Sequence, residues 1–415
     1  MKKLMIVQAA ALGAELLRNH RVDCLGGYPV HALEPVAPAV TCTAQATLRT
    51  AMAPDQHQMF ANGLFLRETF QSVFWSHSAK LVRGERIWDA FRAQGGRVGM
   101  YFFQQSLGEA VDEVVTPAPI HCHGGRMMMA TYQQPQNVMA CENPVPLWRY
   151  WGPLASPKAG REITNAIVRR MLKGDTPELM LIYLPTLDYE LQRHGTSHPK
   201  VAASVRELTL EIAKLSSMAR IYGYEFAVAG DYAITNVTGT VAYPNQLLRQ
   251  AGFFAVRPIH AMRYPDFFRS RAVALCDHQC ALIYCLDATC RDAVRKLLAT
   301  LPEVAEIRDG AGDVDFELVA KPGCWFAWRW WDEPQEAPDY ATHVDIHNKP
   351  GFDPCELFFG RTAFSISTDV SRIKGTHGRA DAPVAMATSF PCAAKTAIEM
   401  AQELKRWLGM PETAL

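Results

Sequence analysis

The sequence has no excess of charge of either sign and no long uncharged apolar run. Lys and Arg together number 42, as do Asp and Glu, so the formal net charge at pH 7 is zero. This balance lacks the basic excess that draws proteins to polyanions, and we predict no nucleic-acid partner. No stretch reaches the roughly 18 apolar residues needed to span a bilayer, so we predict no association with a membrane.

Cysteine does not occur in a pattern that builds a disulfide framework or a zinc finger. The eleven cysteines are an odd number, they are scattered from Cys24 to Cys392, and none forms a CxxC pair. This usage suits a reducing compartment, and we expect a cytoplasmic protein. The N-terminal MKKLMIVQAAALGAELL imitates a signal peptide, but Gln8 interrupts its apolar run and Glu15 ends it. We therefore interpret Lys3 to Val7 as a first buried strand.

The chain does contain short apolar runs separated by helical patterns. Amphipathic spacing predicts helices over 197–222 and 396–408. Alternation of strands and helices favours an α/β fold with a mostly parallel sheet covered on both faces. The runs interpreted as buried strands are 4–7, 179–184, 226–230 and 281–286.

Thr41 is a candidate nucleophile in the segment PAVTCTAQATLRTAMAPDQHQMFANG, residues 38–63. A hydroxyl at the start of a helix can attack an electrophile if a cation lowers its pKa. Threonine at the beginning of a helix is more often a structural cap than a catalytic residue, so the pattern leaves both interpretations open.

Two aspartates lie shortly after predicted buried strands. Asp188 comes after the strand 179–184, with His194 six residues later, and Asp231 comes after the strand 226–230. Carboxylates and imidazoles at neighbouring strand ends suit a divalent cation. A helix-capping aspartate and a surface histidine would produce the same pattern.

Further acidic and histidine residues lie in the second half of the chain. Asp277 is followed by His278, Asp345 and His347 form a D-x-H, and His377 stands between glycines in IKGTHGRAD. A histidine in a glycine-rich turn is not in the setting of a residue packed in a hydrophobic core. This favours a ligand or contact role for His377. The other four are candidates for additional metal ligands.

Four segments follow one another along the chain: PAVTCTAQATLRTAMAPDQHQ, YLPTLDYELQRHG, AVAGDYAITNV and GTHGRADAPVAM. In this order they resemble the nucleotide pyrophosphatase/phosphodiesterase family of the alkaline phosphatase superfamily. The resemblance implies a three-layer α/β/α sandwich that binds two divalent ions, usually zinc, at the strand ends. It also implies a threonine nucleophile, which is Thr41 here, and a phosphoryl-binding asparagine, which is Asn62. Asp188 and His377 correspond to ligands of the first metal, and Asp231 to a ligand of the second.

The sequence also departs from the family pattern at three places. The first strand of the family ends in a metal-binding Asp-Gly, whereas this chain reads VQAAALG. The family's Asp-His pair is Asp231-Tyr232 here, and the histidine expected four residues after Asp188 is Gln192, with His194 two positions late. Asp277, His278, Asp345 and His347 are the candidates to complete the sites. We expect one or two divalent ions, zinc or manganese.

The aromatic segment CWFAWRWWDEP, residues 324–334, has two interpretations. Trp325 could stack on a substrate and Arg329 could contact a phosphate or an aromatic ring. Such a cluster more often packs a cap onto a core.

We predict a single domain over residues 1–415 with an inserted cap at about 244–361.

These features favour a metal-dependent hydrolase of the phosphodiesterase type, acting on a small molecule with a phosphoryl, phosphonate or sulfate centre. Two alternatives stay open. The chain could be a degenerate member that binds a phosphorylated small molecule or a partner without turnover. It could also perform a different reaction in a biosynthetic pathway.

Overall fold

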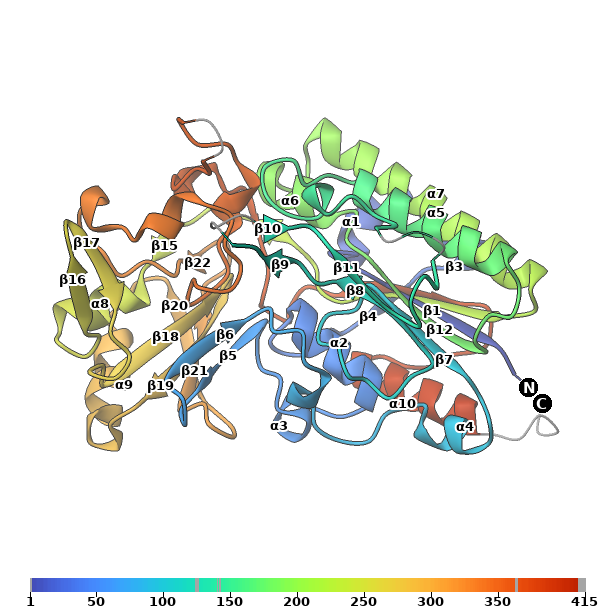
Figure 1. Cartoon of the computed structure of the whole chain (residues 1–415), viewed down its shortest axis with the longest axis horizontal. Coiled ribbons are helices and arrows are strands. Elements are labelled where there is room, and N and C mark those ends of the chain that lie inside the picture. The colour runs from blue at the N-terminus through green and yellow to red at the C-terminus, as the bar shows by residue number, and fades with distance from the viewer. Residues whose placement is uncertain (1, 124–126, 140, 142, 363–364, 410–415) are drawn as a thin grey trace.

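The predicted strands near residues 4–7, 179–184 and 226–230 lie side by side in the middle of an eight-stranded sheet (Figure 1). The computed structural model describes the chain except residues 1, 124–126, 140, 142, 363–364 and 410–415. Each central strand is six residues long and almost wholly buried. Burial on both faces explains their near-continuous apolar sequences.

Parallel pairing dominates the centre of this sheet, and antiparallel pairing is found towards its two edges. Of the seven neighbouring pairs, four are parallel and three are antiparallel. The prediction of a mostly parallel sheet is therefore confirmed. In order across the sheet, the strands are β11 (Thr131–Gln134), β8 (Glu113–Pro117), β7 (Val98–Tyr101), β12 (Leu179–Leu184), β1 (Leu4–Ala9), β13 (Glu225–Gly230), β24 (Val384–Thr388) and β4 (His31–Leu33).

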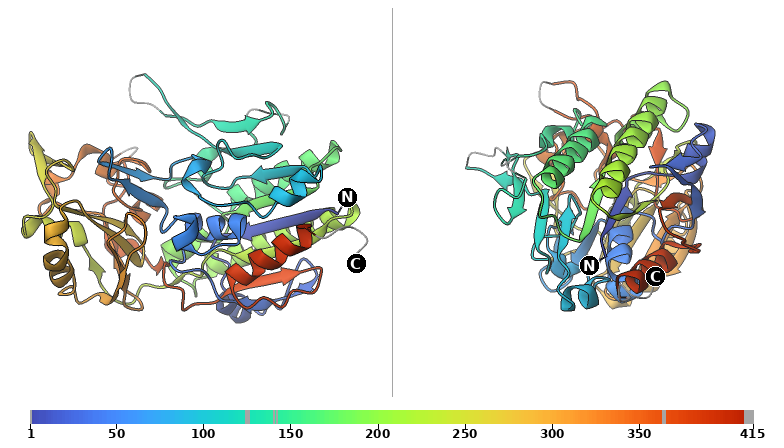
Figure 2. Two further views of the ribbon diagram at one scale, coloured as in Figure 1. Left: turned by 90° about the horizontal axis from the view of Figure 1, so that it is seen from below. Right: turned by 90° about the vertical axis from the view of Figure 1, so that its right-hand side faces the viewer.

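Helices cover both faces of the sheet, which completes the expected three-layer sandwich (Figures 1 and 2). The predicted helices 197–222 and 396–408 are confirmed to within a few residues. Their apolar stripes face the sheet, and α7 buries Val205, Leu208 and Ile212. One face carries α5 (Lys158–Leu172) and α7 (Pro199–Ile221), and the other α2 (Thr41–Thr50), α4 (Asp89–Ala93) and α10 (Ala397–Gly409).

A second sheet with its own hydrophobic core lies at one end of the molecule, inside the region predicted as a cap. Trp328 and Trp330 are buried in this core. The cap boundaries at 244 and 361 stay a prediction. The region contains β18 (Ala272–Asp277), β19 (Cys280–Cys285), β21 (Phe316–Ala320) and β20 (Val304–Asp309) in that antiparallel order, with α8 (Pro244–Gln250), α9 (Arg291–Leu298) and the hairpin of β16 (Val256–Ile259) and β17 (Met262–Pro265).

The remaining elements are short and connect these parts. None of the helices among the described residues is both long and apolar enough to cross a membrane. The short helices are α1 (Ala14–Asn19), α3 (Pro54–His57) and α6 (Asp188–His194), with 3₁₀ turns at Ala79–Leu81, Leu147–Arg149, Ala288–Cys290, Pro334–Glu336, Asp339–Thr342, Pro354–Leu357 and Val370–Arg372. The short strands are β2 (Cys24–Leu25), β3 (Tyr28–Pro29), β5 (Gly63–Leu66), β6 (Gln71–Phe74), β9 (Ile120–His121), β10 (Met127–Met128), β14 (Thr235–Asn236), β15 (Val241–Ala242), β22 (Trp325–Phe326) and β23 (Gly375–Thr376).

Candidate functional site

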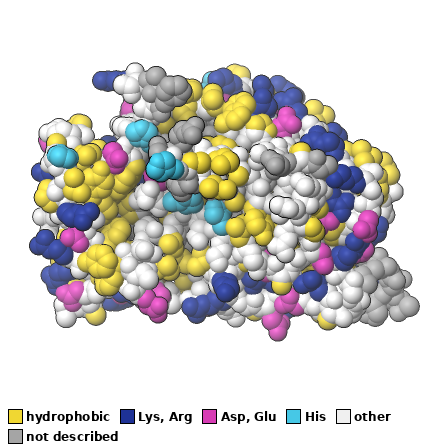
Figure 3. Space-filling view, in the orientation of Figure 1, with side chains coloured by type: hydrophobic (Ala, Val, Ile, Leu, Met, Phe, Trp, Pro, Cys, Tyr) yellow, Lys and Arg dark blue, Asp and Glu magenta, His cyan; other side chains and the backbone are white. Residues whose placement is uncertain are grey.

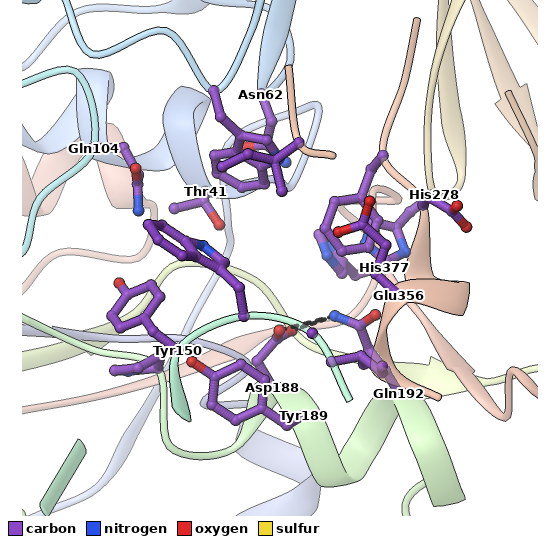
Figure 4. Close-up of a pocket in the computed structure, with 18 of the residues that line it drawn as sticks. Thr41, Asn62, Gln104, Tyr150, Asp188, Tyr189, Gln192, His278, Glu356 and His377 are labelled. Atoms are coloured by element: carbon purple, nitrogen blue, oxygen red, sulfur yellow. Dashed lines mark hydrogen bonds between the residues drawn. The ribbon is translucent and has the colours of Figure 1, made fainter. Parts of the chain in front are cut away.

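A pocket opens where the carboxyl ends of β12 and β13 meet the N-terminus of α2 and the turn of the cap hairpin β18–β19. Its cavity volume is about 90 Å³. Figure 3 shows histidine side chains gathered near the middle of one face, between the cap and the main sheet. The structure brings five predicted site residues to this pocket, namely Thr41, Asn62, Asp188, His278 and His377 (Figure 4).

Thr41 is the first residue of α2, and its side chain lines the pocket. The cap residue of the helix is Val40, in an extended conformation, so Thr41 does not act as the side-chain cap. The first N–H groups of a helix have no carbonyl partner within it, and they favour an anion at that end. The Thr41 hydroxyl lies 3.5 Å from the hydroxyl of Tyr183, at the end of β12.

Asn62 is held beside α2 by a carboxylate from the cap. The Asn62 backbone N–H donates to Oδ2 of Asp277 over 2.8 Å, and its side-chain Nδ2 donates to Oδ1 over 3.2 Å. In turn, Oδ1 of Asn62 accepts from the backbone N–H of Cys42 at 2.9 Å. Burial raises the pKa of Asp277 to about 7. Asp277 is one of the candidates for an additional metal ligand, and in the structure its carboxylate accepts both hydrogen bonds from Asn62.

Asp188 accepts hydrogen bonds from the two residues that replace histidines of the family pattern. Nε2 of Gln192 lies 2.8 Å from both carboxylate oxygens, as the dashed lines of Figure 4 show. The Tyr232 hydroxyl donates to Oδ1, also over 2.8 Å. Burial raises the pKa of Asp188, while these donors act in the opposite direction.

Asp231 lies deeper, behind the pocket, and is 1% exposed. Its Oδ1 accepts from the backbone N–H groups of Ala11, at 3.1 Å, and Tyr232, at 2.8 Å. Its Oδ2 accepts from the Tyr183 hydroxyl at 3.1 Å. Burial raises the pKa of Asp231 well above its ordinary value. One alanine after β1, Ala11, thus contributes a backbone N–H group near the place where the family pattern has a carboxylate.

His377 and His278 lie side by side in the pocket with their ring centroids 3.9 Å apart. Nδ1 of His377 bonds the backbone carbonyl of Ala39 at 2.9 Å, which orients the ring. The Tyr232 ring stacks on His377 with centroids 3.6 Å apart and an interplanar angle of 8°. Burial lowers the pKa of His377 to about 3 and that of His278 well below its usual value.

The side chains present do not fit the two-metal centre. Among the described residues, no three Asp, Glu, His or Cys side chains are grouped so that they could hold a metal ion. His377 keeps the orientation of a metal-binding histidine, with one ring nitrogen on a carbonyl. Zinc sites in enzymes use three protein ligands, and the oxygens of Asp188 and Asp231 already accept from Gln192 and two tyrosines.

Five other predicted residues lie outside this pocket. His194 pairs with Glu190 over 3.2 Å and stacks on a neighbouring histidine. Asp345 accepts from the backbone N–H of His347, whose Nδ1 bonds the carbonyl of Phe74. Trp325 and Arg329 face a different, smaller hollow, where Arg329 contacts the rings of Tyr243 and Trp331. The pocket around Thr41 is built without these five side chains.

Sequence reasoning missed the aromatic lining and most of the donors. Tyr183 stands in the apolar run LMLIYL, where a tyrosine is easily taken for core. Five aromatic residues also line the pocket, and they lie in loops or a short helix far apart in the sequence: Trp75, Tyr150, Trp151, Tyr189 and Phe352. Of these five, Tyr189 lies in the segment YLPTLDYELQRHG of the family resemblance, but nothing in that pattern marks it as a lining residue.

A buried ion cluster supports the rim of the pocket. Nζ of Lys349 lies 2.7 Å from Oδ2 of Asp353 and 2.6 Å from Oε1 of Glu356, and it donates to the carbonyl of His343. Asp353 and Glu356 both line the pocket. The charge of the lysine neutralises one of the two carboxylates. Because a buried charge without its partner is costly, these ion pairs stabilise the loop that carries Asp353 and Glu356.

Cys42, next to Thr41, is not a second nucleophile. Its side chain is fully buried, and burial together with the nearby Asp277 carboxylate raises the pKa of the thiol strongly. A thiol in such surroundings stays protonated and unreactive.

Comparison with known proteins agrees with this architecture. Residues 24–353 match the family described as type I phosphodiesterase/nucleotide pyrophosphatase. The chain therefore belongs to this family of hydrolases, within the alkaline phosphatase superfamily. Enzymes of this superfamily generally use divalent metal ions. No curated protein sequence matches the chain closely enough to count as a relative.

Solved structures with the same fold include two phosphorus-binding hydrolases at low sequence identity. Phosphonoacetate hydrolase from Sinorhizobium meliloti 1021, in complex with phosphonoacetate, is 13% identical with a TM-score of 0.61, covering 98% of this chain and 96% of that chain. Murine ectonucleotide pyrophosphatase/phosphodiesterase 5 is 13% identical with a TM-score of 0.59, covering 99% and 96%. An inactive form of the murine protein is in complex with AMP. At this identity, the likeness concerns the fold.

Proposed function

We propose that this protein is a hydrolase of small molecules that carry a phosphoryl, phosphonate or sulfate centre, and that Thr41 is its nucleophile. The observation that carries the proposal is the position of Thr41. It is the first residue of a ten-residue helix, its side chain lines the pocket, and Asn62 lies beside it. The small phosphorus ligands named for the two similar structures support the proposed substrate class.

The residues of this chain divide the reaction between them. The N-terminus of α2 and the Asn62 amide hold an oxygen of the phosphoryl group, and Asp277 fixes the orientation of Asn62. The Thr41 oxygen forms a bond to phosphorus as the bond to the leaving group breaks. The Thr41 proton passes to the Tyr183 oxygen while the Tyr183 proton passes to Oδ2 of Asp231, and these protons return by the same route when the ester is cleaved. Water then cleaves the Thr41 ester and restores the hydroxyl.

A second candidate function is binding without turnover. It is favoured by the hydrogen bonds that already occupy both carboxylates and by the composition of the pocket. Among the described residues that line it, there is no lysine or arginine to stabilise charge that develops on a phosphoryl group. In this alternative, the pocket holds the same small ligand and Thr41 only contacts it.

Hydrolysis of bis-p-nitrophenyl phosphate and p-nitrophenyl phosphate by the wild type, Thr41→Ala and Thr43→Ala tests the proposal. Thr43 is buried in the same helix, and its hydroxyl has no hydrogen-bond partner among the described residues, so Thr43→Ala is the matched control. We expect Thr41→Ala to lower turnover by at least about 10³-fold while Thr43→Ala keeps it. Equal turnover by the wild type and Thr41→Ala would contradict the proposal. Ligand binding without turnover by any of the three would favour the second candidate.

A further inference from the structure

Neutral side chains donate hydrogen bonds to both aspartates on the acidic side of the pocket, where the family pattern places metal ions. We infer that Gln192, Tyr232 and Tyr183 replace the metal pair of the family and that this protein binds its ligand without a resident metal ion. The inference rests on the proposed function for the identity of the ligand. It is carried by the following contacts.

Hydrogen bonds already occupy the carboxylate of Asp188, the residue that corresponds to a ligand of the first metal. Three hydrogen bonds from Gln192 and Tyr232, each 2.8 Å long, reach its two oxygens. A carboxylate has about four lone-pair positions, so one remains. In a metal site, the cation would take the strongest of these positions, and a histidine in place of Gln192 would add a nitrogen ligand. The glutamine amide instead presents N–H groups to Asp188, and an N–H group cannot bind a cation.

The second metal position is closed by a tyrosine hydroxyl. The Tyr183 oxygen lies 3.5 Å from the Thr41 hydroxyl and 3.1 Å from Oδ2 of Asp231, and so bridges the two groups that the family pattern assigns to one metal. The other Asp231 oxygen accepts from two backbone N–H groups. Each of these contacts provides the partial positive charge that a buried carboxylate requires.

The ring of Tyr232 fills the space next to the remaining histidine. The ring stacks on the ring of His377 with centroids 3.6 Å apart, and its hydroxyl donates a hydrogen bond to Asp188. A single side chain therefore occupies the face of the histidine and one carboxylate of the first site. His377 alone, with the carboxylates engaged elsewhere, is one ligand where zinc requires three.

The replacement has a consequence for ligand charge. Without a cation, the attraction for a phosphoryl group comes from the α2 N-terminus and neutral donors, while Asp188 and Glu356 also face the pocket. A phosphodiester carries one negative charge, and a phosphate monoester at pH 8 carries two. The pocket should therefore bind the diester class more tightly than monoesters.

Zinc binding to the purified full-length chain tests the inference directly and needs no turnover. Calorimetric titration with Zn²⁺ is done after dialysis against EDTA, on the wild type, on Gln192→His with Tyr232→His, and on Gln94→His as a control. Gln94 is exposed, so that control adds a histidine away from both aspartates. We expect no stoichiometric zinc binding by the wild type or the control, and binding at least about 100-fold tighter by the double variant.

Stoichiometric zinc binding by the wild type would overturn the inference, as would a folded double variant that binds zinc no better than the wild type. Thermal unfolding of the wild type in EDTA and in Zn²⁺ repeats the test on the unaltered chain. Equal melting temperatures support the inference, and a rise with zinc overturns it. These readouts are separate from Thr41 chemistry. Failure of the Thr41→Ala experiment would remove the proposed function and leave the zinc result standing.

Discussion

The two sides of the pocket differ in how far they keep the family pattern. The nucleophile wall, consisting of Thr41, Asn62 and Asp277, keeps the threonine and the asparagine in hydrogen-bonded positions around the start of α2. The carboxylate wall, consisting of Asp188, Gln192, Asp231 and Tyr232, keeps two aspartates and replaces their metal-binding neighbours with donors. The carboxylate wall lies at the carboxyl ends of β12 and β13, whereas the nucleophile wall combines the start of α2 and the loop before β5 with the end of β18 in the cap.

This difference shows that a fold can preserve the position of a residue after the reason for its charge has changed. A buried carboxylate needs positive partners, and a metal ion, a tyrosine hydroxyl or a glutamine amide can each meet that need. Asp188 and Asp231 can therefore persist without a metal. Among the described residues that line the pocket, no other side chain can take over the roles that we propose for Thr41 and Asn62. The nucleophile wall is therefore the more informative part for function.

The largest effect on turnover after loss of Thr41 is expected from Asn62→Ala. This change removes the amide that we assign to the phosphoryl oxygen and should lower kcat about 10²-fold, with a smaller change in KM. Steady-state kinetics with bis-p-nitrophenyl phosphate measure both. Asn245→Ala, a buried asparagine in the cap, is the control. An unchanged kcat in Asn62→Ala would place the functional centre elsewhere.

Asp277→Ala tests the support of the nucleophile wall from the cap. It leaves the buried backbone N–H of Asn62 without its acceptor, which should lower the free energy of unfolding by about 2 kcal/mol. Turnover should fall about tenfold, because Asn62 loses its fixed orientation. Denaturant unfolding and kinetics on the same preparation separate the two effects. A stable variant with full turnover would show that Asp277 does not position Asn62.

Tyr232→Phe probes the carboxylate wall with a smaller expected effect. It removes one of three hydrogen bonds to Asp188 but keeps the ring on His377, so the free energy of unfolding should fall by about 1 kcal/mol. Turnover should change less than in Asn62→Ala. An equal loss of kcat in Tyr232→Phe and Asn62→Ala would contradict the claim that the nucleophile wall matters more for turnover than the carboxylate wall.

Glu211→Gln should leave turnover unchanged and alter only the pH dependence of stability. Glu211 accepts from Thr186, in the loop before Asp188, and burial raises its pKa to about 8 from 4.5. The folded state thus keeps a proton that the unfolded chain releases, and the stability of the wild type relative to the variant should fall as pH rises from about 4.5 to about 8. Thermal melts from pH 4 to 9 measure this difference. Parallel curves would show that Glu211 is ionised in the folded protein.

Much of the fold could be predicted from the sequence, because buried parallel strands and amphipathic helices leave strong patterns. The runs 4–7, 179–184 and 226–230 become adjacent strands, and the helix predicted over 197–222 lies on their sheet. Asp188 and Asp231 follow these strands, so their position at one sheet edge followed from parallel pairing.

The partners of these residues could not be predicted in the same way. Asn62 and Asp277 are 215 residues apart, and only the docking of the cap hairpin against the start of the main domain brings them together. The D-H pattern at 277–278 is equally compatible with a metal ligand. In the same way, Trp325 is part of an aromatic cluster that suggested stacking on a substrate, and the fold buries it in the core.

By itself, the sequence determined the family, the layered α/β architecture and the loss of an Asp-Gly and two histidines from the metal pattern, because these follow from local patterns and their order. Only the tertiary structure decided what stands in their place. Hydrogen bonds such as those from Tyr232 to Asp188 and from Tyr183 to Asp231 join residues on different elements. Their geometry depends on how β12, β13 and α6 pack, and the one-dimensional pattern carries no record of those distances.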